Sequence, residues 1–401
     1  MIELKEKNKL IINTDKIFYR SFLKNIFQIP FEIKFWDGEE EKYGESDSKF
    51  KLIFNSPLSK TKLLNDPSLI LGEAYMANEI DIDGDLQNII EYLYQNKKTI
   101  LHNNSNRHIK NNIKNSKDNV HYHYDIGNEF YKLWLDDTMT YSCGYFKFPW
   151  DSLNDAQKNK TSHILRKLNL NKSQTLLDIG CGWGELILTA AKEYNVKAMG
   201  ITLSSEQFNK VKERIRTDGL ENLVEVELLD YREIKNKKFD RIVSVGMIEH
   251  VGKELLPEYF SKVKNLLDED GISLLHCITG INGDGVNSWI NKYIFPGGYI
   301  PTIKELITYM SDEEFYLLDV ESLRRHYGRT LEHWSKNFEN ALPEVKKKYD
   351  DKFIRMWRLY LNGCAASFNS GNIDIHQFLF TKGVNNNLPW TREYIYNNKL
   401  N

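Results

Sequence analysis

Residues 176–184 read Leu-Leu-Asp-Ile-Gly-Cys-Gly-Trp-Gly, and this stretch decides the fold. An apolar run ends in an acid and leads into three glycines at alternate positions, after which a helix is expected to begin near Glu185. Glycine lets the backbone take positive φ angles and approach a ligand closely, and a helix N-terminus favours a negatively charged group. The stretch therefore predicts a strand, a ligand-binding turn and a helix, although a purely structural turn has the same composition.

Strands and helices are expected to alternate around this turn. An amphipathic helix is predicted over 153–168. Apolar strands are predicted at 175–179, 196–201, 224–229, 240–245 and 271–276. Such alternation predicts a parallel, doubly wound α/β sheet. Beyond about residue 300 the chain is rich in aromatic residues, and we expect it to be helical there.

The N-terminal part has a different pattern of expected strands and helices. Residues 1–95 are expected to form a small α+β domain, with strands at 31–36 and 50–54 and helices at 69–76 and 86–94. A linker at 96–120 follows. Between Lys97 and Lys117 it carries six basic residues and no acidic one. This stretch fits a solvated linker or a patch that meets anionic phospholipid headgroups, and 121–401 is expected to form the catalytic domain.

Composition narrows the class of protein. The chain has 401 residues, with 54 Lys plus Arg against 56 Asp plus Glu, and 41% of its residues are hydrophobic. The near-neutral charge argues against a nucleic-acid partner. No apolar run is long enough to span a membrane, and no signal peptide is recognisable at the N-terminus. The four cysteines form no CxxC pair, so no disulfide framework or metal site is expected. A cytoplasmic multidomain enzyme is predicted.

The glycine-rich turn resembles the first motif of class I S-adenosylmethionine methyltransferases, in which it packs against the methionine part of the cofactor. The predicted cofactor residues of this turn are Asp178, Gly180, Cys181, Gly182 and Gly184. The family usually ends its second strand with an acid that holds the ribose hydroxyls. Here Thr202 and Gln207 are expected to supply neutral hydrogen bonds instead. Asp230 and Tyr231 follow the third strand where adenine is normally held, although Asp230 also fits a sheet-capping role.

Five further segments closely resemble the cyclopropane-fatty-acyl-phospholipid synthases and the related mycolic acid cyclopropane synthases. They are YHYDIGN at 122–128, YSCGYF at 141–146, GMIEHVG at 246–252, LLHCIT at 274–279 and LNGCA at 361–365. The resemblance covers roughly residues 120–390, whereas the first 115 residues match the family only loosely. It adds Tyr141, Ser142 and Gly246 to the expected cofactor site.

The resemblance implies a reaction and a second site. These enzymes transfer a methyl cation to the double bond of a lipid acyl chain, and a bound bicarbonate then removes a proton so that the ring closes. By resemblance, the bicarbonate ligands are the side chains of Glu249, His276 and Tyr327 and backbone groups of Cys143 and Ile278. The residue pattern agrees in part, because Glu249 follows the fourth strand and His276 is expected to end the fifth, at the ligand-binding edge of the sheet. A helix-capping Glu249 and a core His276 are the alternatives.

Cys364 corresponds to a cysteine that the family carries and that was once regarded as a nucleophile. It lies on an apolar stripe with Trp357, Tyr360 and Phe368 at helical spacing. This pattern favours a small packing residue over a nucleophile, and Cys364 is kept as a catalytic candidate. Aromatic residues are expected to form an acyl tunnel. The candidates are Phe146, Trp150, Trp183, Tyr293, Phe295, Trp334, Phe338 and Trp357.

The sequence thus predicts cyclopropane formation on unsaturated phospholipids by an enzyme that visits the inner face of the membrane peripherally. The resemblance also implies a homodimer formed through a lipid-binding N-terminal domain. Methyl- or methylene-branched lipid products are the nearest alternative. Methylation of a soluble acceptor and a catalytically silent lipid-binding module are more distant ones.

Overall fold

The computed structural model describes residues 2–95, 126–281 and 286–396. The predicted linker, its basic stretch and the first part of the YHYDIGN motif lie outside these ranges. The chain divides into two compact units. The first, here the N-terminal unit, comprises Met1–Ser105, Asn287–Ile294 and Leu342–Asn372. The second, here the large-sheet unit, comprises Asn106–Val286, Phe295–Ala341 and Ile373–Asn401.

These units differ from the continuous ranges predicted from the sequence. Helices α11 (Ser288–Tyr293) and α15 (Asp351–Asn369) pack on α3 (Pro67–Met76) inside the N-terminal unit, and α15 also packs on α4 (Leu86–Gln95). Trp289 of α11 lies so close to Gly72 of α3 that a Cβ atom at Gly72 would meet its ring at 2.2 Å. Two segments far along the chain therefore complete the N-terminal unit, while the functional assignment of each range stays a prediction.

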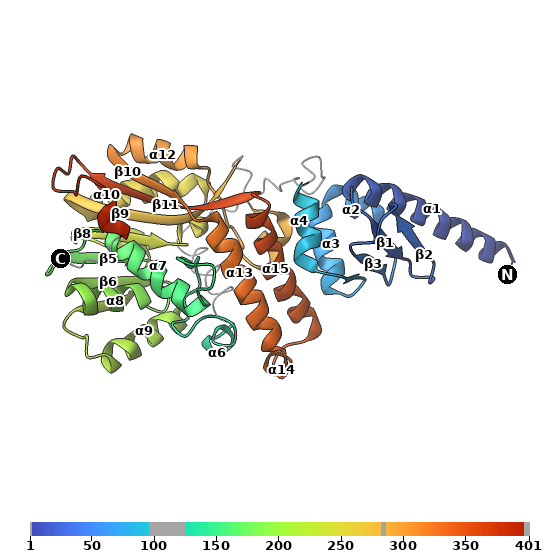
Figure 1. The fold of residues 1–401 in the computed structure, drawn as a ribbon, viewed down its shortest axis with the longest axis horizontal. Coiled ribbons are helices and arrows are strands. Elements are labelled where there is room, and N and C mark those ends of the chain that lie inside the picture. Colours follow the sequence, from blue (N-terminus) through green and yellow to red (C-terminus); the bar gives the residue numbers. More distant parts are fainter. Residues whose placement is uncertain (1, 96–125, 282–285, 397–401) are drawn as a thin grey trace. The chain divides into compact units, whose positions relative to one another are not determined.

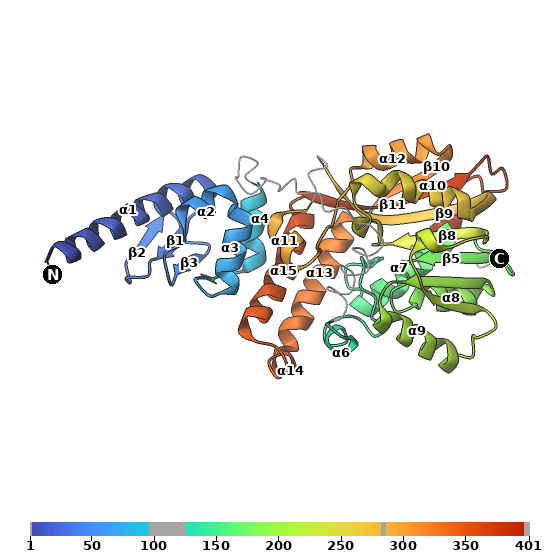
Figure 2. The ribbon, with the colours of Figure 1, turned by 180° about the vertical axis from the view of Figure 1, so that it is seen from behind.

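The N-terminal unit is built on a small mixed sheet with the strand order β2-β1-β3-β4. The predicted strands and helices of this region are confirmed, whereas α1, β2, α2 and β4 were not predicted. Helix α1 lies along the small sheet (Figure 2), and its residues Tyr19, Phe22 and Ile26 are buried in the same core as Phe31 and Phe54. The remaining elements are α1 (Ile2–Ile26), β1 (Phe31–Lys34), β2 (Glu40–Tyr43), β3 (Lys51–Phe54), α2 (Lys60–Asn65), β4 (Ile80–Asp83) and α14 (Leu342–Val345).

The large-sheet unit contains a seven-stranded sheet with the order β10-β11-β9-β8-β5-β6-β7. The five neighbouring strands β9, β8, β5, β6 and β7 are parallel to one another. At the other edge, β11 pairs antiparallel with β9, and β10 pairs antiparallel with β11. The strands are β5 (Thr175–Ile179), β6 (Lys197–Thr202), β7 (Val224–Leu228), β8 (Phe239–Val245), β9 (Leu267–Gly280), β10 (Phe315–Ser322) and β11 (Ile373–Lys382).

The five predicted strands of this sheet are confirmed. The chain forms helices beyond residue 300, as predicted, but β10 and β11 were not predicted and join the sheet. Strand β11 carries His376 and Gln377 at fully or nearly fully buried positions, so its sequence lacks the polar–apolar alternation of a half-buried strand.

Helices cover both faces of the large sheet (Figure 1). Leu176 points into the core formed with α7, α8 and α9, and its neighbour Leu177 points into the core formed with α10 and α12. The helices are α6 (Asn128–Tyr131), α7 (Leu153–Lys167), α8 (Glu185–Tyr194), α9 (Ser205–Thr217), α10 (Leu256–Leu266), α12 (Ile303–Asp312), α13 (Arg324–Asn340) and α16 (Glu393–Tyr396). Within the described residues, no helix combines the length and apolarity needed to cross a membrane.

Candidate active site

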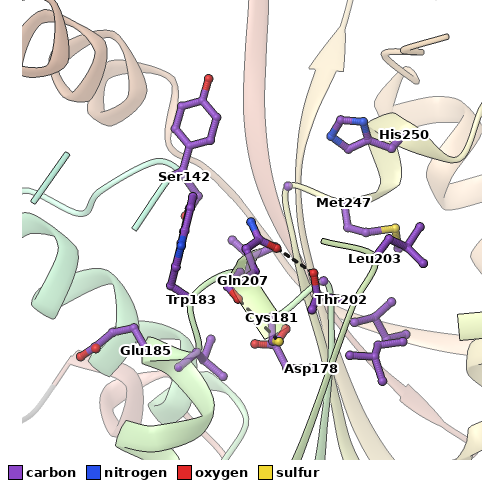
Figure 3. Close-up of a pocket in the computed structure, with 18 of the residues that line it drawn as sticks. Ser142, Asp178, Cys181, Trp183, Glu185, Thr202, Leu203, Gln207, Met247 and His250 are labelled. Carbon is purple, nitrogen blue, oxygen red and sulfur yellow. Dashed lines mark hydrogen bonds between the residues drawn. The ribbon is translucent and has the colours of Figure 1, made fainter. Parts of the chain in front are cut away.

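A cavity of about 150 Å³ opens at the carboxyl ends of β5, β6, β7 and β8, where parallel sheets of this kind bind ligands. All the predicted cofactor residues except Gly184 line it, together with the segment from Thr138 to Ser142. Figure 3 shows Trp183 on one side of the cavity and Met247 on the other, with Thr202 and Gln207 between them.

The glycine-rich turn leaves room where a ligand would lie. Gly182 has a φ of +54°, and a Cβ atom built on it would meet nothing within 4 Å, so its backbone faces open space. Gly180 has a φ of +87°, and a Cβ atom there would press against Met247 at 3.0 Å. Gly184 has a different role. It caps the N-terminus of α8 and packs tightly against Val211, which explains why it does not line the cavity.

A buried lysine, which sequence reasoning missed, lies in the wall of this cavity. Lys160 of α7 is only 4% exposed, and its Nζ donates a hydrogen bond to the Ser142 hydroxyl at 3.0 Å. Burial lowers the pKa of Lys160, while the nearby acids Asp136 and Asp178 oppose that shift. A lysine on the buried face of a predicted amphipathic helix was the available signal, since such a residue is rarely buried without a partner.

Asp178 is buried at the end of β5. Burial raises its pKa to about 7, and the charge of Lys160 acts against this rise. Its Oδ1 atom has no hydrogen-bond partner in the described part of the chain. Asp178 and Lys160 thus bring a buried carboxyl and a buried amine to the part of the cavity where the methionine portion of the cofactor is expected. The Oδ1 atom of Asp178 is available there to contact a ligand.

Neutral groups occupy the end of β6, as the sequence predicted. The Thr202 hydroxyl donates to Oε1 of Gln207 at 2.7 Å, so the Gln207 amide NH₂ is left as a donor. Ser204 caps helix α9 and accepts from the Gln207 backbone N–H at 3.3 Å. This cap fixes the first turn of α9 and thereby holds Gln207 at the cavity wall.

Asp230 and Tyr231, which follow β7, also line the cavity. The Asp230 carboxylate accepts hydrogen bonds from Arg232 Nε at 2.8 Å and Nη2 at 2.7 Å, and it also caps the short helix η2 (Tyr231–Glu233). Arg232 lines the cavity and was not singled out from the sequence. Burial raises the pKa of the Tyr231 phenol, and the ring packs edge-on against Tyr259 with centroids 5.5 Å apart.

A second polar cluster lies beside the cavity. Glu249 belongs to η3 (Ile248–His250), between Met247 and His250, which both line the cavity. Its Oε1 accepts a hydrogen bond from the Ile278 backbone N–H at 2.7 Å, whereas its buried Oε2 has no partner among the described residues. Burial raises the Glu249 pKa to about 7.

His276 lies inside β9, four residues before its end, and not at the strand terminus as the sequence suggested. Its carbonyl accepts from the Gly246 N–H at 2.8 Å, which ties it to the cavity wall. Its Nδ1 lies 3.1 Å from Nε2 of Gln377, and its Nε2 has no partner in the described parts of the chain. Burial lowers the His276 pKa well below its usual value, so the imidazole is neutral.

Cys143 and Tyr327 both contact the Leu323 carbonyl, which lies 3.9 Å from the Cys143 Sγ and accepts the Tyr327 N–H at 3.0 Å. Cys143 is fully buried, and burial raises the pKa of its thiol. Tyr327 lies in the first turn of α13, and its ring packs edge-on against Trp334 at 6.0 Å. Trp334 in turn contacts Tyr141 at 5.2 Å, and Tyr141 lines the cavity. An aromatic chain thus connects Tyr327 to the predicted cofactor site.

Cys364 belongs to the other compact unit. It lies on α15 and lines a separate apolar cavity of about 180 Å³ within the N-terminal unit. Burial raises the pKa of the Cys364 thiol to about 12, so almost no thiolate forms at neutral pH. The polar groups of this cavity are few. Its lining is dominated by aliphatic and aromatic side chains, among them Leu23, Phe27, Leu52, Leu71, Ile89 and Leu359.

The residues predicted to form an acyl tunnel do not line a single cavity. Trp183 lines the cofactor cavity, and Trp334 and Phe338 are fully buried in the large-sheet unit. Trp357 is buried in the N-terminal unit. Trp150 is 78% exposed, so its expected place in a tunnel was wrong.

Comparison with known proteins adds relatives over nearly the whole chain. Residues 111–378 match the family described as mycolic acid cyclopropane synthetase, and residues 18–105 match a domain of unknown function. A "probable fatty acid methyltransferase" of Pseudomonas putida is 37% identical over 381 residues, covering 92% of this chain and 96% of that protein. The cyclopropane-fatty-acyl-phospholipid synthase of Escherichia coli (strain K12) is 42% identical over 271 residues, covering 67% of this chain and 69% of that protein.

Solved structures of cyclopropane synthases are also similar to this chain. The cyclopropane synthase MmaA2 from Mycobacterium tuberculosis has a TM-score of 0.63 at 35% identity, covering 66% of this chain and 98% of that chain. The same values hold for the mycolic acid cyclopropane synthase CmaA1, whose structure was solved in complex with SAH and CTAB.

Proposed function

Because the chain belongs to the mycolic acid cyclopropane synthetase family, we propose that it transfers a methylene group from S-adenosylmethionine to the cis double bond of a phospholipid acyl chain. The predicted family, the class I methyltransferase fold and the enzyme class are confirmed by the likenesses above. The observation that carries the finer proposal is the polar cluster beside the cofactor cavity, where Glu249 and His276 each keep a buried polar atom without a partner among the described residues.

The cofactor cavity offers matching groups for S-adenosylmethionine, which supplies the methyl cation when bound. Gly182 leaves its backbone open to a ligand, and the Gln207 amide can donate to the ribose hydroxyls. Lys160 and Ser142 would hold the carboxylate of the methionine part, because Lys160 is a buried cation in the wall next to the glycine-rich turn. The SAH complex of the relative CmaA1 supports this use of the cavity.

The reaction makes two carbon–carbon bonds, one in each of two stages. One alkene carbon takes the methyl cation from the sulfonium, and a carbocation forms at the other alkene carbon. A proton then leaves the new methyl group, and the electron pair of that C–H bond closes the ring. Water must be kept away, since it would trap the cation. The buried ring of Trp334 and the half-buried ring of Tyr141 exclude water, and their π faces favour a nearby cation.

A base is needed for the proton, and bound bicarbonate would supply it. The residues fit such an anion. With the Gln377 amide donating to Nδ1 of His276, the buried Nε2 carries the hydrogen and can donate to an anion. Oε2 of Glu249 can accept the hydrogen of bicarbonate. Oε1 is fixed by Ile278, which orients the carboxylate. The Tyr327 hydroxyl and the Cys143 backbone are the further ligands that the family resemblance implies.

The apolar cavity of the N-terminal unit is proposed to hold an acyl chain. This cavity has a volume of about 180 Å³. Its lining offers dispersion contacts and few hydrogen-bond partners, which suits a hydrocarbon chain.

The nearest alternative product is a methyl- or methylene-branched chain, and the name of the Pseudomonas putida relative favours it. Both products arise from the same carbocation. Incubation with S-adenosylmethionine and oleoyl phospholipid vesicles, followed by identification of the product, separates them. A peripheral position at the inner membrane face and a homodimer also belong to this proposal.

A further inference from the structure

Two aromatic rings project from the surface just after the segment that lines the cofactor cavity. Phe148 is 52% exposed and Trp150 is 78% exposed. Their rings stack with centroids 5.2 Å apart and planes within 2° of each other. Scattered exposed apolar residues are ordinary, but adjacent large ones form a patch that marks an interaction site.

The loop that carries these rings, residues 147–151, is firmly built. Asp151 Oδ2 accepts hydrogen bonds from the backbone N–H groups of Lys147 at 2.8 Å and Phe148 at 3.1 Å, and from the Asn159 side chain at 3.2 Å. The Asp151 N–H donates back to the Phe148 carbonyl at 3.2 Å. The rings therefore face solvent because the loop holds them there.

Contacts with α13 fix the base of the loop. Phe146 is buried, its backbone N–H donates to Nδ1 of His326 at 3.0 Å, and its ring stacks on His333 at 5.5 Å. The Arg329 guanidinium lies 5.1 Å above the Phe146 ring and donates to the Pro149 carbonyl. The same stretch of chain thus runs from the cavity wall at Ser142 to the exposed rings.

Three cations lie at or near the base of the loop. Lys147 is exposed, and Arg166 is close enough to contribute to lowering its pKa, after burial. Arg329 adds a third cation at the loop. Of the nearby acids, Asp151 accepts hydrogen bonds from backbone N–H groups of the loop, Asp155 is engaged with Ser152 in the capping box of α7, and Glu332 lies beside His333. Aromatic rings rimmed by Lys and Arg suit the headgroup region of an anionic bilayer.

We propose that loop 147–151 docks the large-sheet unit on an anionic phospholipid surface, with Phe148 and Trp150 inserted at headgroup depth. This inference rests on the proposed function, in which the substrate is a membrane lipid. A second copy of the chain fits the patch less well. Two aromatic side chains offer at most about 500 Å², whereas a stable protein interface needs about 800 Å² per partner.

The test uses the full chain and vesicles of dioleoyl phosphatidylethanolamine and dioleoyl phosphatidylglycerol. Flotation measures the partition of the wild type, of the double variant Phe148→Ser/Trp150→Ser, and of Trp390→Ser. Trp390 is fully exposed in the same unit and is the matched control. We expect the double variant to bind at least about tenfold more weakly, and the control to bind like the wild type. Unchanged thermal melting and S-adenosylhomocysteine affinity verify that the double variant is folded.

Two results would overturn the inference. One is equal vesicle binding by the double variant and the wild type. The other is a wild-type dimer that the double variant breaks without a change in vesicle affinity. Product formation from detergent-dispersed lipid separates this inference from the proposed function. The double variant should match the wild type in detergent and be slower on vesicles. A wild type that modifies lipid in neither form contradicts the proposed function, while the flotation result still decides the role of the loop.

Discussion

Oε1 of Glu249 accepts a hydrogen bond from the Ile278 backbone N–H at 2.7 Å, while the buried Oε2 of the same carboxylate meets no partner in the described part of the chain. One oxygen is therefore anchored to β9, and the other is presented at a fixed position. A buried polar atom without a partner carries a cost of about 1–3 kcal/mol. A bound anion with a hydrogen to donate would remove that cost, which is why the bicarbonate proposal is centred on this carboxylate.

Replacement of Glu249 by Gln should keep cofactor binding and reduce turnover by about a hundredfold or more, the range expected when acid–base support is lost. The amide keeps the shape of the side chain but presents a weaker acceptor. Calorimetry with S-adenosylhomocysteine and a steady-state assay on lipid vesicles measure the two effects. Glu254→Gln, at an exposed glutamate of the same segment, is the matched control. Full activity in Glu249→Gln would remove Glu249 from the bicarbonate site.

The raised Glu249 pKa also has a consequence for stability. The folded state holds the Glu249 proton up to about pH 7, whereas the unfolded state releases it near the ordinary value of 4.5. Between these pH values the folded state binds more protons, so the stability contribution of Glu249 falls as pH rises. Glu249→Gln removes this loss. The melting temperature of the variant relative to wild type should therefore be higher at pH 8 than at pH 4.5, and a pH-independent difference would contradict the shifted pKa.

Lys160→Met should weaken binding of S-adenosylhomocysteine by about tenfold or more, because charge-assisted contacts to a carboxylate contribute about 1.5–3 kcal/mol. The sharper readout is selectivity. Wild type should strongly prefer S-adenosylmethionine over its decarboxylated analogue, and Lys160→Met should lose most of this preference. Lys158→Met is the control, because Lys158 lies two residues before Lys160 on the exposed side of α7. An unchanged preference would show that Lys160 serves only to hold Ser142.

Cys364 offers a matched pair of substitutions. Cys364→Ala should keep turnover, because a thiol with a pKa of about 12 is not a nucleophile at neutral pH. Cys364→Leu should reduce turnover on long-chain lipids, because the added side chain fills part of the apolar cavity that Cys364 lines. Thermal melting of both variants checks for overpacking. Equal activity of the leucine variant would argue against acyl-chain binding in this cavity.

The sequence was informative where local chemistry dictates structure. The glycines after β5 and the neutral end of β6 at Thr202 were readable because each depends on a few adjacent residues. Glu249 and the cofactor residues could be assigned to one edge of the sheet, since the carboxyl ends of parallel strands meet there.

Long-range packing was not readable in the same way. Nothing local to α15 indicates that it completes the N-terminal unit, because that depends on its fit to α3 and α4. Strand β11 was missed because it buries polar residues such as Gln377, whose side-chain Nε2 pairs with His276, 101 residues earlier in the chain. Lys160 was overlooked for the same reason, since its role depends on Ser142, which lies 18 residues earlier in the chain.

The central claim is that this chain forms a cyclopropane ring on a phospholipid, and product identification tests it most directly. The purified protein is incubated with S-adenosylmethionine and oleoyl phospholipid vesicles, and the extracted lipid is examined by proton NMR and fragmentation mass spectrometry. A ring and a methylene branch have the same mass, so the NMR spectrum decides. The account predicts loss of olefinic protons and the appearance of upfield cyclopropane protons. Vinylidene or branched-methyl signals, or no modified lipid at all, would contradict it.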